Sequence, residues 1–327
     1  MIYSDVPVSL LSLFSKDKSF ALPIIGSPLL NKCGLHILRM RLADISLKLR
    51  RFQVAGFSKS KQYQQFKRDG IIAIDKFLSN EDFTNLVAEV KNTMAYADNQ
   101  TPIKGYGEEG FGQKHNHDWG FDRYDGGTLN RFYSIEDKHI HTQKFLNDKR
   151  LIDLTSRYAG TYHDKNKYDL YKLHHGDESD NADSQKLIHR DTFHSAVKLW
   201  YFLEDVTEEQ GPFHYMPGSH LMTKKRLAWE KNRSVQASLD NKGGAFRISA
   251  EELEQVYDGN LQGYPVKANT LVIADIRGFH CRGLGTESTS RLSIYANIRP
   301  SPFLPAYNAS SLKKIGSQFK NLFGKSN

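Results

Sequence analysis

The segment from residue 189 to residue 203 decides how the rest of this chain is interpreted. It reads His189-Arg190-Asp191-Thr192-Phe193-His194-Ser195-Ala196-Val197-Lys198-Leu199-Trp200-Tyr201-Phe202-Leu203. The alternation after Ser195 predicts a β-strand. A His-x-Asp pair in extended backbone presents both side chains on one face, because the strand period is two residues. Together with a remote second histidine, such a pair forms a 2-His-1-carboxylate triad, which leaves positions open on a non-haem Fe(II) ion.

The His-x-Asp pair by itself is a weak signal. With 13 His and 37 Asp or Glu among 327 residues, about 1.5 pairs of this spacing are expected by chance. The sequence holds two, and the second is His175-Gly176-Asp177. That second pair is typical of a polar loop, whereas the first precedes a clear strand pattern. His189 and Asp191 are therefore the preferred candidates.

The remaining periodicity predicts helices first and strands later. A helix stop at Gly70 separates a short helix from a β-rich run, and Ser79 is a predicted N-cap. The glycine-rich stretch 105–134 is interpreted as a long loop. Further strands are predicted at 168–173, 195–203, 213–216, 270–276 and 292–298. This order predicts an α+β fold with an antiparallel sheet system.

Composition excludes several classes of protein. Two cysteines, Cys33 and Cys281, cannot make a disulfide framework or a Cys-rich zinc module. The apolar stretch 19–31 is shorter than the roughly 20 residues that span a bilayer. No basic region opens the sequence, so we expect no secretory signal and a cytoplasmic protein.

The net charge of +8 is unevenly distributed. Residues 1–60 carry nine Lys or Arg against three Asp, and residues 309–327 carry four Lys and no acid, so residues 61–308 have a net charge of −2. A near-neutral centre argues against a nucleic-acid groove. We expect a catalytic domain at 61–308, a basic N-terminal extension at 1–60 and a basic tail at 309–327.

Both basic ends have the pattern of amphipathic helices. In the extension the apolar positions run from Leu38 to Phe52, and in the tail from Leu312 to Phe323. Such helices either pack on the body or on a second subunit, or lie in an anionic membrane interface. The second option would place the protein at the inner face of the membrane. The oligomeric state is left open.

Several further motifs share their spacing with one family. They are Gln210-Gly211-Pro212, Pro217-Gly218-Ser219-His220, Gly278-Phe279-His280-Cys281-Arg282-Gly283 and Arg291-Leu292-Ser293. With the 189–203 segment they resemble the phytanoyl-CoA dioxygenase-like family of Fe(II)/2-oxoglutarate-dependent oxygenases. The resemblance begins near Phe66 and ends near Pro300. It implies a double-stranded β-helix, a jelly-roll fold related to cupins, with flanking helices.

The resemblance also implies a set of site residues. Iron would be held by His189, Asp191 and His280, and the cosubstrates would be 2-oxoglutarate and O₂. Arg291 would grip the distal carboxylate of 2-oxoglutarate, a task suited to a bidentate, permanently charged donor, and Ser293 would assist.

Two residues of the 195–203 strand are further candidates for cofactor contact. Trp200 precedes Gly211 by the spacing of the family's cosubstrate-contacting Trp, and Lys198 shares its strand face. The chain departs from some members at Arg282, where they have Ser, which leaves that part of the cosubstrate or substrate contact undefined.

These expectations converge on a hydroxylase acting on an unactivated C–H bond. Asp191 favours hydroxylation, because halogenating relatives lack this carboxylate. The substrate would be a small molecule, a saccharide or a lipid-linked compound, and the core sugars of lipopolysaccharide are a compatible class. The alternatives are a non-catalytic jelly-roll binding protein and a peripheral membrane scaffold.

Overall fold

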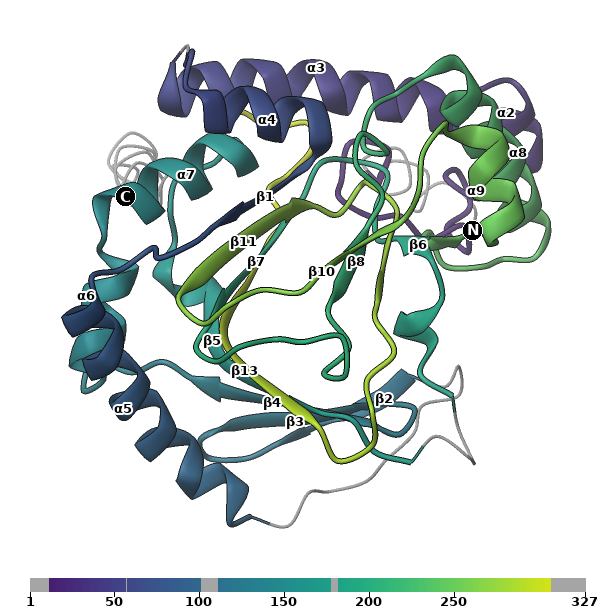
Figure 1. Cartoon of the computed structure of the whole chain (residues 1–327). Coiled ribbons are helices and arrows are strands. Elements are labelled where there is room, and N and C mark those ends of the chain that lie inside the picture. Colours follow the sequence, from purple (N-terminus) through teal and green to yellow (C-terminus); the bar gives the residue numbers. More distant parts are fainter. Residues whose placement is uncertain (1–11, 57, 101–110, 178–181, 307–327) are drawn as a thin grey trace, which may run out of the picture.

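Two antiparallel sheets form the body of the protein in the computed structural model, which describes residues 12–56, 58–100, 111–177 and 182–306 (Figure 1). The larger sheet has the strand order β1-β11-β7-β13-β5-β4-β3-β2, and the smaller has the order β10-β8-β12-β6-β9. Helices cover the outside. The predicted α+β class and the jelly-roll core with flanking helices are confirmed.

The strands of the larger sheet are β1 (Ile71–Ile74), β2 (Phe111–Asn116), β3 (Gly120–Asp125), β4 (Thr128–Ser134), β5 (Tyr168–His174), β7 (Val197–Phe202), β11 (Thr270–Asp275) and β13 (Ser290–Ile298). Those of the smaller sheet are β6 (His189–Arg190), β8 (Phe213–Tyr215), β9 (Phe246–Arg247), β10 (Gln262–Tyr264) and β12 (His280–Arg282). All five strands predicted from Tyr168 onward are present, with ends shifted by at most two residues.

The helices are α2 (Pro28–Lys32), α3 (Leu35–Ala55), α4 (Lys61–Asp69), α5 (Asn80–Asp98), α6 (Ile140–Leu146), α7 (Lys149–Ala159), α8 (Lys224–Leu239) and α9 (Ala250–Val256), with 3₁₀ turns η1 (Lys165–Lys167) and η2 (Ser184–Lys186). Ser79 caps α5, since its side chain accepts a hydrogen bond from the Asp82 N–H. Both features predicted around residue 70, the helix stop and the strand, are present.

The prediction of a long loop at 105–134 is wrong for residues 111–134, the part that the structure describes. Residues 111–134 form the strands β2, β3 and β4, which extend the larger sheet (Figure 1). These strands bury polar groups: Arg131 Nε donates to Asp122 Oδ1 at 3.1 Å, and Asn130 Nδ2 donates to Asp125 Oδ2 at 3.0 Å. These hydrogen bonds compensate the cost of burying the polar side chains. Because polar residues occupy buried positions, the strands lack the apolar alternation by which a strand is normally recognised.

Strand β7 shows how the layers are built. Leu199 and Tyr201 face outward into a core shared with Leu86 and Val90 of α5, because alternate residues point to opposite faces. Trp200 faces the other way, into the space between the two sheets. This inner face is where Lys198 and Trp200 reach the candidate site.

Gly70 sets the angle between α4 and β1. Its φ of +78° is a left-handed conformation that glycine adopts without steric cost. A Cβ at this position would lie 2.4 Å from both His220 Nδ1 and Tyr215 Oη. Only glycine therefore fits between α4 and the loop that leads out of β8.

The predicted basic helix of the extension is present as α3. The periodic apolar residues from Leu38 to Phe52, which defined it in the sequence, are exposed rather than buried. Its buried positions are His36, Arg39, Met40, Ala43, Leu47 and Arg50. The predicted tail helix at 309–327 lies outside the described residues, and the domain limits at 60 and 308 stay predictions. In the described part of the chain, no helix combines the length and apolarity needed to cross a bilayer.

Candidate active site

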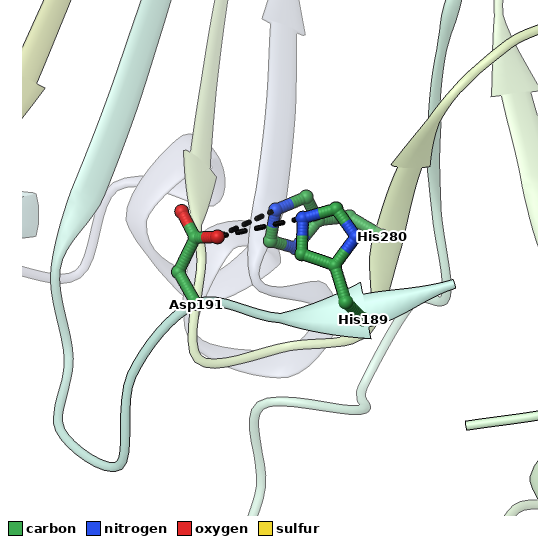
Figure 2. Close-up of side chains that lie close together, drawn as sticks. All are labelled: His189, Asp191 and His280. Atoms are coloured by element: carbon green, nitrogen blue, oxygen red, sulfur yellow. Dashed lines mark ion pairs between the residues drawn. The ribbon is translucent and has the colours of Figure 1, made fainter. Parts of the chain in front are cut away.

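Strand pairing brings the two distant histidines together. His189 on β6 and His280 on β12 are directly opposed in the antiparallel ladder, with ring centroids 4.5 Å apart. Asp191 follows β6, and its Oδ1 lies 3.4 Å from His189 Nε2 and 3.8 Å from His280 Nε2. Figure 2 shows the three side chains converging on one point. All three are buried, and their ligand atoms lie within 4.8 Å of one another.

The hydrogen bonds of the two histidines prepare this point for a metal ion. His189 Nδ1 donates to the Leu187 carbonyl at 2.7 Å, and His280 Nδ1 donates to the Gly278 carbonyl at 2.9 Å. Since a carbonyl can only accept, the proton of each neutral ring is on Nδ1, and the lone pair is on Nε2. Both Nε2 atoms are buried without a hydrogen-bond partner. Two imidazole nitrogens and a carboxylate with open positions are a donor set that fits Fe(II).

Asp191 is held in place on its other oxygen. Lys198 Nζ lies 2.8 Å and Arg299 Nη2 lies 3.2 Å from Asp191 Oδ2, and Lys18 Nζ donates to the Asp191 carbonyl. Burial alone would raise the pKa of Asp191, but the positive charge of the Lys198 ammonium holds it well below its usual value. The carboxylate is therefore ionised at neutral pH and turns one oxygen toward the histidines.

A cavity opens beside the triad. Its volume is about 70 Å³, and its wall includes His189, His280, Lys198, Trp200, Arg282 and Arg291. Arg291 is 9% exposed, and among the described residues it has neither an ion-pair nor a hydrogen-bond partner. Burial lowers the pKa of Arg291 to about 10, so the group remains a cation at neutral pH. An unpaired buried guanidinium beside a cavity is suited to bind a carboxylate.

Arg282 lines the same cavity but is already neutralised. It contacts Asp183 through Nη1 and lies 3.1 Å from Asp125 Oδ2 through Nη2. Its Nη2 also donates to Asn130 Oδ1, which accepts a second hydrogen bond from the Tyr171 hydroxyl. The two carboxylates compensate the positive charge of Arg282, so among the described residues of the cavity wall Arg291 is the arginine without a charge partner.

The remaining residues that the sequence analysis named, Trp200, Ser293 and His175, differ in how they are placed relative to the triad. Trp200 packs on Phe213 with ring centroids 4.6 Å apart, and Phe213 in turn contacts the His280 ring. Ser293 is buried on β13, on the strand face of Arg291, and is not part of the cavity wall. His175 of the alternative pair lies away from the triad, with Nε2 3.1 Å from the Gln210 carbonyl.

The sequence alone did not indicate Arg299 and Lys18. Both reach Asp191 from positions more than 100 residues away in the sequence. A clue existed only for Arg299, which continues the strand that carries Arg291. The contact of Lys18 also shows that the N-terminal extension takes part in building the site.

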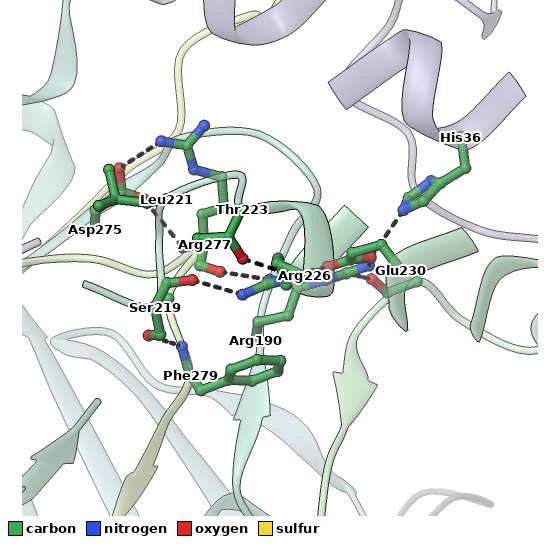
Figure 3. Close-up of polar contacts among 12 residues, drawn as sticks. His36, Arg190, Ser219, Leu221, Thr223, Arg226, Glu230, Asp275, Arg277 and Phe279 are labelled. Atoms are coloured by element: carbon green, nitrogen blue, oxygen red, sulfur yellow. Dashed lines mark hydrogen bonds and ion pairs between the residues drawn. The ribbon is translucent and has the colours of Figure 1, made fainter. Parts of the chain in front are cut away.

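Behind the triad lies a buried charge cluster centred on Glu230 (Figure 3). Its carboxylate binds Arg190 at 2.7 Å, Arg226 at 2.8 Å and His36 at 3.0 Å. Arg190 lies between His189 and Asp191 in the sequence, and strand alternation points it away from the metal site. Arg226 Nη2 donates to the Arg277 carbonyl at 3.0 Å, just before the segment that ends in His280. Glu230 therefore ties together both halves of the triad and α3.

A jelly roll that gathers two histidines and a carboxylate beside an unpaired arginine defines the class of Fe(II)/2-oxoglutarate-dependent oxygenases. The family model of phytanoyl-CoA dioxygenase (PhyH) matches residues 66–243, and the chain belongs to that family. It is accordingly an oxygenase-type enzyme that depends on iron and 2-oxoglutarate, uses O₂, and acts on a small-molecule substrate.

Solved structures with a similar fold share little sequence with this chain. The α-ketoglutarate-dependent epimerase SnoN of nogalamycin biosynthesis is 18% identical, with 74% of this chain and 85% of that chain covered and a TM-score of 0.45. AviO1 from Streptomyces viridochromogenes is 15% identical (76% and 98% covered, TM-score 0.45). HygX from Streptomyces hygroscopicus, solved with nickel and 2-oxoglutarate, is 14% identical (77% and 90% covered, TM-score 0.42). No curated protein matches the chain.

Proposed function

We propose that this enzyme hydroxylates an unactivated C–H bond of a small-molecule, saccharide or lipid-linked substrate, with lipopolysaccharide-core sugars as one compatible class. The observation that carries the reaction type is the complete triad, in which Asp191 stands beside two histidines with free Nε2 atoms. Retention of the carboxylate supports hydroxylation rather than halogenation.

In this proposal His189, Asp191 and His280 hold the iron on one face. When bound, iron and 2-oxoglutarate supply the oxidation by O₂, with succinate and CO₂ as coproducts. Arg291 receives the distal carboxylate of 2-oxoglutarate, and Ser293 supports that end. The polypeptide contributes the positions of these groups and keeps bulk water out.

Lys198 and Arg299 act on the metal site through Asp191. By binding Oδ2 they leave Oδ1 facing the histidines, and they compensate the buried negative charge. Trp200 would contact the cosubstrate, and it continues a row of aromatic rings across the cavity wall that includes Phe132, Tyr171 and Tyr295. Flat aromatic surfaces suit a ligand with apolar C–H faces, such as a sugar ring.

The catalytic unit proposed here spans residues 61–308, with 1–60 and 309–327 as flanking segments. The contacts of Lys18 with Asp191 and of His36 with Glu230 support a role for the first flank in completing the site.

The experiment is an assay of succinate formation from 2-oxoglutarate, with and without Fe(II). We expect slow Fe(II)-dependent turnover without substrate, stimulated by core oligosaccharides or lipid-linked sugars, with a product heavier by one oxygen atom. Asp191→Ala is expected to abolish both. A stimulating substrate whose product has an unchanged mass would indicate epimerisation, and one that loses two hydrogens would indicate desaturation or ring closure. Either result would contradict hydroxylation.

A further inference from the structure

The outer face of α3 carries an exposed row of aliphatic side chains, named here the α3 ridge: Leu38, Leu42, Ile45 and Leu49. Their exposed fractions are 54%, 39%, 55% and 66%. Intervals of four, three and four residues keep them on one side of a helix. Isolated exposed leucines are normal on soluble proteins, but a contiguous row marks an interaction surface.

The inner face of α3 is fixed to the body of the protein. Met40, Ala43 and Leu47 are buried against it. Two polar contacts add to this anchoring, since His36 Nε2 lies 3.0 Å from Glu230 and Asp44 Oδ1 accepts from Arg277 at 3.1 Å. The helix cannot roll to bury the ridge without breaking these contacts, so the ridge stays available to an external partner.

The surroundings of the ridge are cationic. Arg41 and Lys48 are exposed beside it, and the one acid of α3, Asp44, is already paired with Lys48 and Arg277. The neighbouring helix α4 exposes Lys61 and Lys67, and also Arg68, which is paired with Asp69. Both helices lie along the same edge of the molecule (Figure 1), and the Arg51 guanidinium lies 5.7 Å from the centre of the Phe66 ring.

We propose that the α3 ridge is a docking surface for an anionic lipid bilayer. In this arrangement α3 lies in the plane of the interface, with its leucines among the acyl chains and Arg41 and Lys48 at the level of the headgroups. The apolar row supplies burial, and the basic flank selects negatively charged lipid.

Two other occupants of the ridge are conceivable, a second copy of the chain and its own C-terminal segment, and charge disfavours both. A twofold-related copy would bring its own Arg41 and Lys48 to the same flank, with no free acid on α3 to pair with them. The chain's own end is also basic: the described part ends at Ala306, hydrogen-bonded to Gln53 of α3 in both directions, and residues 307–327 contain four Lys and no acid. That segment is basic in sequence, like the flank of the ridge, so charge does not favour it as the occupant.

The test is co-sedimentation of the full-length protein with vesicles of equal parts phosphatidylcholine and phosphatidylglycerol, and with vesicles of phosphatidylcholine alone. We expect binding to the first kind only, weakened at least tenfold by high salt. Ile45→Ser with Leu49→Ser, and separately Arg41→Glu with Lys48→Glu, should each weaken binding at least tenfold. The matched control is Leu239→Ser with Leu284→Ser, which alters leucines that lie elsewhere and are at least as exposed, 59% and 77%. This variant should bind as wild type.

Four results would overturn the proposal: wild-type protein that ignores anionic vesicles at low salt, a ridge variant that still binds, loss of binding on deletion of 309–327 with the ridge intact, or a dimer in sedimentation that the ridge variant dissociates. Circular dichroism melts check that the variants are folded. Succinate formation is measured in solution on the same preparations, so failure to bind vesicles does not bear on the hydroxylase proposal, and failure of turnover does not bear on docking.

Discussion

At the scale of single residues, the candidate site depends on which polar atoms are already satisfied. Each triad histidine has one nitrogen bonded to a backbone carbonyl and one buried without a partner. Of the three arginines in the cavity wall, Arg123 and Arg282 are paired with carboxylates and Arg291 is not. A buried polar group without a partner costs free energy unless a ligand satisfies it, so these atoms mark where ligands belong.

The triad predicts the outcome of removing single ligands. Fe(II) affinity should fall by more than about 100-fold in His189→Ala, Asp191→Ala and His280→Ala, since loss of an outer-shell partner alone typically costs 10- to 100-fold. Asp177→Ala, from the alternative His-x-Asp pair, should bind iron like the wild type. Isothermal titration under anaerobic conditions measures this. Loss of binding in Asp177→Ala with retention in Asp191→Ala would show that the wrong pair was chosen.

Arg291 predicts the strength of cosubstrate binding. In Arg291→Gln, 2-oxoglutarate should bind more weakly by about 2 to 4 kcal/mol, roughly 30- to 1000-fold, because its distal carboxylate is left without a charged partner. The measurement is the 2-oxoglutarate concentration dependence of succinate formation, with Lys186→Gln, a nearby surface change, as control. If the affinity of Arg291→Gln for 2-oxoglutarate is unchanged, the distal carboxylate is bound by another cation, Lys198 or Arg282.

At the scale of elements, short strands position the site and a buried cluster supports them. Strands β6 and β12 have only two and three residues, too few to be rigid by backbone pairing alone. The Glu230 carboxylate holds Arg190 of β6, while Arg226 holds the Arg277 carbonyl ahead of β12 (Figure 3). Helices α8 and α3 thus act on the metal site through one carboxylate.

Replacement of Glu230 should therefore be costly. In Glu230→Gln two buried arginines lose their counter-charge, and we expect a loss of about 3 to 5 kcal/mol in the free energy of unfolding. The matched control is Glu252→Gln, which alters a half-exposed pair with Arg233; glutamine keeps the N-terminal capping contact there, so the cost should stay within about 1 kcal/mol. Urea unfolding followed by circular dichroism compares the two. Equal losses would mean that the Glu230 cluster is not special.

At the scale of the whole molecule, the fold buries histidines in neutral form. His175 and His220 are 2% and 5% exposed, and burial lowers the pKa of each to about 4. An unfolded histidine titrates near 6.5. Between these values the unfolded chain binds more protons than the folded protein, so stability is present above pH 6.5 and is lost as the pH falls toward 4.

This linkage predicts acid destabilisation of the metal-free protein. Between about pH 7.5 and pH 5, each of the two histidines should cost about 2 kcal/mol of unfolding free energy. Urea unfolding in the presence of a chelator at both pH values gives the loss. His175→Gln and His220→Gln should each reduce the loss by about that amount, whatever their effect on stability at pH 7.5. If the variant that carries both substitutions loses as much unfolding free energy between the two pH values as the wild type, other groups cause the acid sensitivity.

Periodicity and local signals in the sequence were sufficient to predict five of the strands from Tyr168 onward, the cap at Ser79 and the stop at Gly70, because these depend on neighbours within a few residues. The family was suggested by the resemblance of several motifs taken together, and the jelly-roll class was what that resemblance implied. The same reasoning failed at residues 111–134, where buried ion pairs and amide hydrogen bonds replace the apolar pattern.

The tertiary structure alone decided three things. The register of β6 with β12 places His280 opposite His189, and no local pattern encodes a pairing across 91 residues. Ion pairs with Asp125 and Asp183 neutralise Arg282 and leave Arg291 free, which depends on segments far apart in the chain. The face of α3 that is buried is the one rich in Arg and His rather than in leucine, because carbonyls and carboxylates of the body satisfy those side chains, a compensation that a hydrophobic pattern does not record.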